Sequence, residues 1–85
     1  MNSDKALVEI YVPAAAKKFD VYIPLRCRMS EVIRLVSNAL SDLSDGKYKA
    51  TGESILCDAD SGMIFNINVE VWELGIKNGS RLMLI

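Results

Sequence analysis

The fold is decided by residues 30–43, which read SEVIRLVSNALSDL. Apolar residues recur there at spacings of three and four with polar residues between them, a pattern that predicts an amphipathic helix. Ser30 is the expected N-cap, and Glu31 in the first turn suits the positive end of the helix. Asp45-Gly46 is expected to end it. The residues expected on its apolar side are Val32, Ile33, Leu35, Val36, Ala39, Leu40 and Leu43.

Two segments upstream of the helix, residues 7–12 and 18–23, alternate between apolar and polar residues as half-buried strands do. Pro13 and the alanines that follow it predict a loop, so the two strands should form a hairpin, and Pro24 should end the second strand. The side chains expected to face the helix are Val8, Ile10, Val12, Phe19, Val21 and Ile23.

Downstream of the helix the predicted elements are short. In order they are a strand at 55–57, a turn at 58–62, a very short strand at 63–65, a helical turn through 69–74, a tight turn at 77–80 and a strand at 81–85. Residues 47–54 fit no element. Asn68 is expected to cap the helical turn and Gly75 to close it, while Asn78-Gly79 is a strong turn signal.

This order of elements predicts an α+β domain of the ubiquitin-like β-grasp class. A mixed sheet of about four to five strands packs on one amphipathic helix, because no other element can cover that face of the sheet. The first and last strands should be parallel neighbours at the centre of the sheet. We expect residues 1–85 to form a single domain in which residues 1–5 are frayed.

Residues 74–85, which read LGIKNGSRLMLI, carry a Gly-Ile-x-Asn-Gly-x-x-Leu pattern that ends within the last strand. This ending resembles that of the YukD/EsaB family, ubiquitin-like small proteins of bacterial type VII secretion systems. The resemblance extends to length and element order over nearly the whole chain. The same residues also have plain folding roles, because Gly75 and Gly79 suit turns and Ile76 suits the core. The motif therefore indicates a family and marks no site.

Composition argues against most enzymes and against nucleic-acid binding. The 85 residues include 10 Lys and Arg, 11 Asp and Glu and no His, for a net charge of −1. Without His, the commonest general base and metal ligand is missing, and a balanced charge offers no electrostatic footprint for nucleic acid. Cys27 and Cys57 lack the spacing of a zinc site, and we expect two reduced thiols, with a disulfide as the alternative. We predict no catalytic residues, metal or cofactor.

The residues at positions 84 and 85 argue against conjugation. Ubiquitin-type modifiers and sulfur carriers end in a flexible Gly-Gly whose carboxylate is activated, whereas this sequence ends in Leu84-Ile85. Leu82 and Leu84 should face the core, which would fix the last residues in the sheet. We therefore expect neither a conjugated modifier nor a sulfur carrier.

Strand alternation also predicts which side chains face away from the helix. Such an open, partly apolar sheet face is a candidate partner-binding surface, although scattered exposed apolar residues are also normal. Its predicted members are Leu7, Tyr11, Tyr22, Leu56, Met83 and Ile85. In this assignment Ile55 and Cys57 face the helix.

Trp72, Arg26 and Arg28 are secondary candidates. A half-exposed Trp is a good anchor for a partner, and the arginines could meet an acidic surface. The alternatives are a Trp that covers the edge of the core and arginines that form a solvated rim.

Together these features predict a non-catalytic protein–protein interaction module. From the resemblance we expect a cytoplasmic accessory or regulatory component of a type VII secretion system, with apparatus proteins as partners and a second copy of the chain as a further candidate. The sequence shows no signal peptide and no apolar run long enough for membrane insertion, so any membrane association would be peripheral, through a protein. The alternatives are a ubiquitin-like adaptor of another pathway and a β-grasp domain cut from a larger membrane-associated protein.

Overall fold

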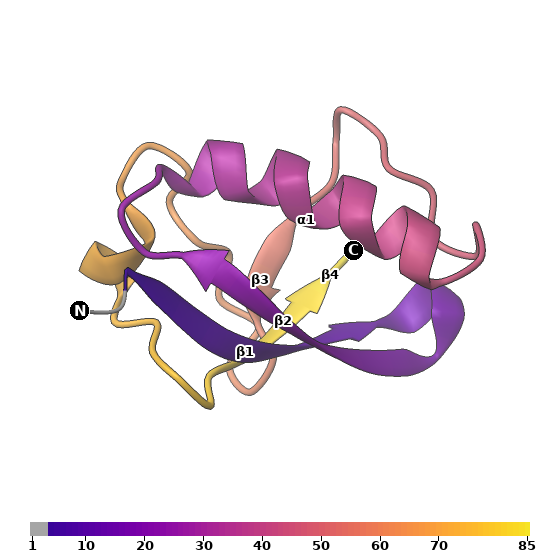
Figure 1. The fold of residues 1–85 in the computed structure, drawn as a ribbon, viewed down its shortest axis with the longest axis horizontal. Helices are drawn as coiled ribbons and strands as arrows, with labels where there is room; N and C mark the ends of the chain where they lie inside the picture. Colours follow the sequence, from indigo (N-terminus) through magenta and orange to yellow (C-terminus); the bar gives the residue numbers. More distant parts are fainter. Residues whose placement is uncertain (1–3) are drawn as a thin grey trace.

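A computed structural model describes residues 4–85, in which one helix packs on a four-stranded sheet (Figure 1). The elements, in chain order, are β1 (Lys5–Val12), the 3₁₀ turn η1 (Pro13–Ala15), β2 (Lys17–Pro24), α1 (Met29–Leu43), β3 (Leu56–Asp58), the 3₁₀ turn η2 (Val71–Leu74) and β4 (Arg81–Leu84). The predicted β-grasp fold is confirmed, with four strands.

The sheet has the order β2-β1-β4-β3. β1 and β2 form the predicted antiparallel hairpin, β3 pairs antiparallel with β4, and β1 lies parallel to β4 at the centre. The turn at 77–80 extends this central pairing, because the Leu7 amide donates to Asn78 Oδ1 (2.7 Å) and the Gly79 amide donates to the Leu7 carbonyl (2.9 Å). Gly79 has φ +89°, which a residue with a side chain rarely adopts.

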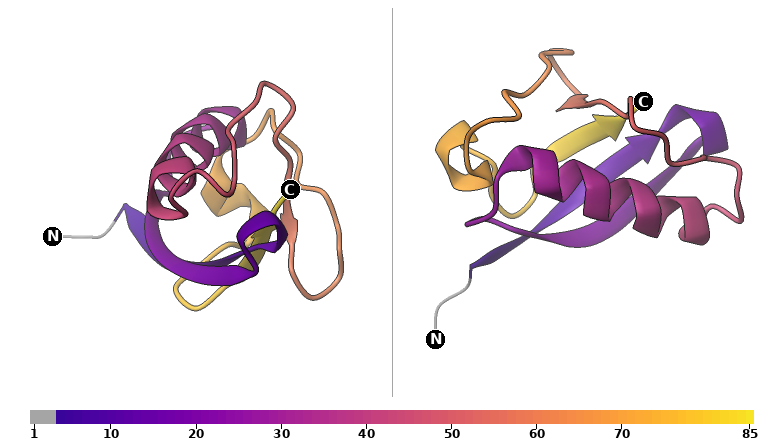
Figure 2. Two further views of the ribbon diagram at one scale, coloured as in Figure 1. Left: turned by 90° about the vertical axis from the view of Figure 1, so that its right-hand side faces the viewer. Right: turned by 90° about the horizontal axis from the view of Figure 1, so that it is seen from above.

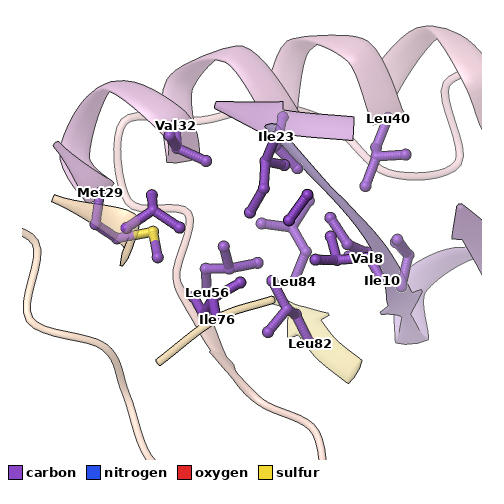
Figure 3. Packing of buried hydrophobic residues seen from close by; sticks show 14 of the residues in the cluster. Val8, Ile10, Ile23, Met29, Val32, Leu40, Leu56, Ile76, Leu82 and Leu84 are labelled. Carbon is purple, nitrogen blue, oxygen red and sulfur yellow. The ribbon is translucent and has the colours of Figure 1, made fainter. Parts of the chain in front are cut away.

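α1 covers one face of the sheet, and the opposite face carries no helix in residues 4–85 (Figures 1 and 2). Between the two layers lie the alternate residues of β1 and β4 together with one side of α1 (Figure 3). The side chains that are fully or almost fully buried there include Val8, Ile10, Ile23, Val32, Leu40, Leu82 and Leu84. Removing these side chains from water is the main favourable contribution to folding.

The apolar side of α1 is narrower than the sequence indicated. Val32, Val36 and Leu40 are buried, but Leu35 and Leu43 are about half exposed. Leu35 lies beside the edge strand β2, and Leu43 is the last residue of the helix, so neither is fully covered by the sheet.

The start of α1 differs from the prediction. The cap residue is Arg28, not Ser30, and no side chain caps the helix. Instead, the first amides of the helix donate hydrogen bonds to a segment distant in sequence. The Met29 amide donates to the Val69 carbonyl (2.9 Å) and the Ser30 amide to the Ile67 carbonyl (3.1 Å). The helix ends at Leu43 with Ser44 as its C-cap, just before the expected stop at Asp45-Gly46, where both residues have positive φ.

Three shorter segments also differ from expectation. The hairpin loop contains the 3₁₀ turn η1, which ends at Ala16 in the left-handed region. The expected strand at 63–65 is reduced to one bridge between Ile64 and Cys57. Tyr48, in the segment that fitted no element, is buried and its hydroxyl hydrogen-bonds the Ser54 hydroxyl.

The second 3₁₀ turn is capped by Glu70, not by Asn68. Glu70 and Glu73 form a reciprocal capping box, in which each side chain accepts a hydrogen bond from the other residue's amide. Gly75 closes the turn in the left-handed conformation, as predicted.

Of residues 1–5, for which we expected fraying, Lys5 begins β1 and the Asp4 carbonyl accepts a hydrogen bond from the Leu25 amide. Residues 1–3 lie outside the described residues.

Candidate functional site

The open face of the sheet holds most of the residues predicted for it. Leu7 lies directly opposite Tyr22 on β2, and Tyr11 lies directly opposite Met83 on β4. Directly opposed residues face the same side of a sheet. The exposed fractions are 38% for Leu7, 68% for Tyr22 and 58% for Ile85, so this face is accessible in the monomer.

Leu56 is not on this face. It lies opposite Leu84, a core residue, and points into the cluster beneath α1 (Figure 3). The predicted alternation for this strand is therefore wrong by one residue: Cys57 lies opposite Met83, and Ile55 exchanges two backbone hydrogen bonds with Ile85. Cys57 and Ile55 take the open side that the prediction gave to Leu56.

A row of charges crosses the middle of the open face. Glu9 on β1 lies between Asp20 on β2 and Arg81 on β4. Lys18 forms an ion pair with Glu9 (3.7 Å), and Arg81 pairs with Asp60. The predicted surface is therefore two surfaces, with charged side chains separating them.

On one side of the charged row lie Leu7 and Tyr22. They line an open groove with a mixed rim of charged and polar residues from β1, β2 and the turn before β4. Charged and polar residues therefore surround these two side chains.

On the other side lies an apolar group that we call the apolar cluster. Ile64 joins it because its bridge to Cys57 places both on the same side of the sheet. The members of the apolar cluster are Tyr11, Ile55, Ile64, Met83 and Ile85. Three of them, Ile55, Ile64 and Ile85, are exposed apolar side chains.

Sequence reasoning missed Ile55 and Ile64. The alternation over residues 55–57 predicts a core position for Ile55, but three residues are too few to show which face of the sheet each side chain takes. The signal for Ile64 was an apolar run, residues 63–65, next to a predicted turn, and it was interpreted only as a strand.

The secondary candidates Arg26 and Trp72 meet each other. The segment around Arg26 pairs with η2, since the Trp72 amide donates to the Leu25 carbonyl and the Val71 amide to the Cys27 carbonyl, both at 3.0 Å. The Arg26 guanidinium stacks over the Trp72 ring at 5.4 Å from its centroid, a cation–π contact.

The indole N–H of Trp72 also has a hydrogen-bond partner. Its Nε1–H donates to Glu70 Oε1 (2.7 Å), while half of the side chain stays exposed. Arg28 is exposed, and its backbone forms an isolated antiparallel β-bridge with that of Glu70. The three predicted residues therefore lie at one place, away from the apolar cluster.

The acidic turn after β3 has a structural role. Asp58 Oδ2 accepts hydrogen bonds from the amides of Ser61 (2.7 Å) and Asp60 (3.1 Å), and these bonds, with Ser61 the larger contributor, hold the pKa of the Asp58 carboxyl below its usual range. Burial, and to a lesser degree the charge of Asp58, raise the pKa of the Cys57 thiol. A thiol held protonated is a poor nucleophile.

Cys27 and Cys57 are both free thiols. Within residues 4–85 no three side chains of His, Cys, Asp or Glu gather where they could hold a metal ion. In the same residues, no helix has the length and the apolar character that crossing a bilayer requires.

Solved structures similar to this chain are ubiquitin-like domains. The ubiquitin-like domain of the Mycobacterium tuberculosis type VII secretion system protein EccD1 superposes with a TM-score of 0.77 at 17% identity, covering 98% of this chain and 99% of that one. The EccD5 ubiquitin-like domain from Mycobacterium xenopi gives 0.71 at 24% identity, covering 98% and 94%.

A third similar chain belongs to a MycP5-free ESX-5 inner membrane complex, with a TM-score of 0.71 at 19% identity; the match covers 98% of this chain and 21% of that one. No protein-family model and no curated protein sequence matches the chain. At these identities the similarity establishes the ubiquitin-like fold.

Proposed function

We propose that this chain is a non-catalytic, ubiquitin-like binding module of a bacterial type VII secretion system, of the YukD/EsaB kind, and that it binds protein partners through the apolar cluster. The observation that carries the proposal is the apolar cluster itself, which occupies the face of the sheet that α1 leaves open. Exposed, contiguous apolar side chains on a small domain are typical of an interface.

The similar structures support the secretion-system part of the proposal. Two are ubiquitin-like domains of EccD proteins, and a third chain is part of an inner membrane complex. From them and from the ending at residues 74–85 we infer a cytoplasmic accessory component whose partners are apparatus proteins. Its association with the membrane would then be peripheral.

The chemistry of binding follows from the two kinds of side chain on the open face. The apolar cluster would supply most of the binding free energy, because burying apolar area is favourable at roughly 25 cal/mol per Å². The charged row beside it would fix the orientation of the partner and reject surfaces of the wrong sign.

A second candidate is a domain of a larger membrane-associated protein. The match to one-fifth of a chain in the inner membrane complex supports it, because there the same fold is one part of a longer protein. An adaptor of another pathway would bind through the same surface and differ in its partners.

Capture of partners from the native cytoplasm and membranes tests the proposal. The wild-type chain is compared with Ile64→Asp/Ile85→Asp, which places charges in the apolar cluster, and with Ile67→Asp, the same kind of change made once at an exposed isoleucine outside it. We expect the wild type and Ile67→Asp to recover type VII apparatus proteins and the double variant to lose them.

Two outcomes would contradict the proposal. Equal recovery by all three proteins would exclude the apolar cluster and direct attention to Arg26 and Trp72. Failure of the wild type to recover any apparatus protein would remove the secretion-system assignment. Circular dichroism of each variant establishes that it is folded.

A further inference from the structure

The two edges of the sheet are finished differently. β3 is three residues long, and the chain that follows it covers its outer edge: the Asp58 amide donates to the Met63 carbonyl (2.9 Å) and Cys57 bridges Ile64. β2 is eight residues long, and within residues 4–85 its backbone forms no hydrogen bond to any segment other than β1. An unpaired edge of this length is a template for another strand.

The side of β2 that faces α1 is also open. A small apolar groove runs between them, lined by Val21, Ile23, Leu35 and Ala39 among others. Leu35, Ala39 and Leu43 recur every four residues along α1, so they form a stripe beside the edge strand. A strand added to β2 would therefore find backbone partners and an apolar surface together.

The charges on β2 indicate which strand fits. Lys18 and Asp20 both lie on the open face, on either side of Phe19. Asp20 sits directly opposite Glu9, a like charge, and no cation in residues 4–85 forms an ion pair with it. Like charges directly opposite each other are destabilising. Lys18 offsets the charge of Glu9, and a positive partner from outside would offset that of Asp20.

A second copy of β2, running antiparallel, supplies that partner in one register. With the two-fold axis at Phe19, Lys18 of each copy lies opposite Asp20 of the other, and the pair forms twice. An axis at Asp20 would place the Asp20 residues of the two copies opposite each other, and an axis at Lys18 would do the same with the two Lys18 residues. An axis at Val21 places Lys18 opposite Pro24, which has no amide to donate. The Phe19 register also leaves Pro24 outside the paired segment.

We propose that two copies of this chain associate edge to edge through β2, antiparallel about a two-fold axis at Phe19, with reciprocal Lys18–Asp20 pairs. The sheets of the two copies become continuous. Both helices lie on the same side of this sheet, and because α1 runs antiparallel to β2 (Figure 1), its Leu43 end lies toward the axis. The open faces of both copies remain uncovered, so this association is independent of binding through the apolar cluster.

Sedimentation of the full chain, from micromolar to millimolar concentration, tests the proposal by charge exchange. Asp20→Lys and Lys18→Asp should each weaken dimerisation roughly ten-fold or more, because two attractive cross-strand pairs become two repulsive ones. The double variant Lys18→Asp/Asp20→Lys should restore it, because the pairs are reversed and complementary again. Glu53→Lys, an exposed site far from β2 in the sequence, changes the net charge by the same amount as Asp20→Lys and should have no effect.

The proposal is overturned if the wild type stays monomeric at every concentration, or if a dimer forms that neither single variant weakens. Weakening by both single variants without rescue in the double variant would overturn the Phe19 register. Hydrogen exchange gives an independent check: the β2 amides that do not bond to β1 should become more protected as concentration rises, and those in the Asp20→Lys variant should not.

Discussion

The two faces of the central strands carry similar residues that differ in their burial. Leu82 and Leu84 of β4 are buried beneath α1, whereas Met83 between them lies on the open side with Tyr11. All three side chains are apolar and of similar size. The difference teaches that apolar character alone does not assign a role: α1 makes Leu82 and Leu84 part of the core, whereas Met83, with no helix above it, stays partly exposed.

The largest expected effect tests that difference directly. Leu84→Ala should lower the free energy of unfolding by about 2–5 kcal/mol, because it removes a fully buried side chain and leaves a cavity. Met83→Ala, one residue earlier, should cost less, because this side chain is only partly buried. Urea titration measures both. Equal losses would mean that the two faces do not differ as described.

A smaller effect is expected at the turn before β4, which hydrogen-bonds Leu7 near the start of β1. Gly79→Ala should cost about 1–2 kcal/mol, since a side chain is strained at φ +89°. Gly52→Ala is the matched control: both glycines have open space around them, and Gly52 has no positive φ. The difference between their thermal midpoints isolates backbone strain, and identical midpoints would contradict it.

The turn after β3 should make stability depend on pH. The folded pKa of Asp58 lies below its unfolded value of about 3.9. Asp58 therefore stabilises the fold above that value, and this contribution is lost as pH falls through the lower, folded pKa. Asp58→Asn keeps an oxygen acceptor without the charge.

In urea titrations between neutral pH and pH 2, the wild type should lose more stability on acidification than Asp58→Asn. Parallel pH profiles for the two proteins would show that the Asp58 charge does not contribute.

The smallest effect is expected at the stacked pair Arg26–Trp72. Arg26→Gln should change the free energy of unfolding by about 0.5–1 kcal/mol or less, as for exposed cation–π contacts. The emission of Trp72, the one tryptophan of the chain, should shift because its neighbour is lost. An unchanged spectrum would argue that the stacking does not persist in solution.

Long segments with an alternating pattern were predicted well, because many residues together determine which side chains face the core. Six residues of β1 fixed the burial of Val8, Ile10 and Val12, and the same logic placed Tyr11 opposite Met83. Leu56 was misplaced because its strand has only three residues, so its facing is set by pairing with Leu84 and not by its own pattern.

The predicted N-cap of α1 was wrong for a related reason. The sequence predicts Ser30 as the cap of α1. In the structure the carbonyls of Ile67 and Val69, which are distant in sequence, accept hydrogen bonds from the first amides of the helix. The contact between Arg26 and Trp72 is likewise not visible in the sequence, although the sequence makes both residues candidates for partner binding. Local patterns do not report contacts that depend on how remote segments meet.

The parallel pairing of β1 with β4 has a mechanical consequence. A pull applied through the start of β1 and the end of β4 acts along both strands in opposite directions, so it loads their cross-links in shear. These links are backbone hydrogen bonds, including the one from the Gly79 amide to the Leu7 carbonyl and the one from the Glu9 amide to the Ser80 carbonyl. Under shear they must break together instead of one after another. A pull of this kind would therefore meet its greatest resistance at the first step.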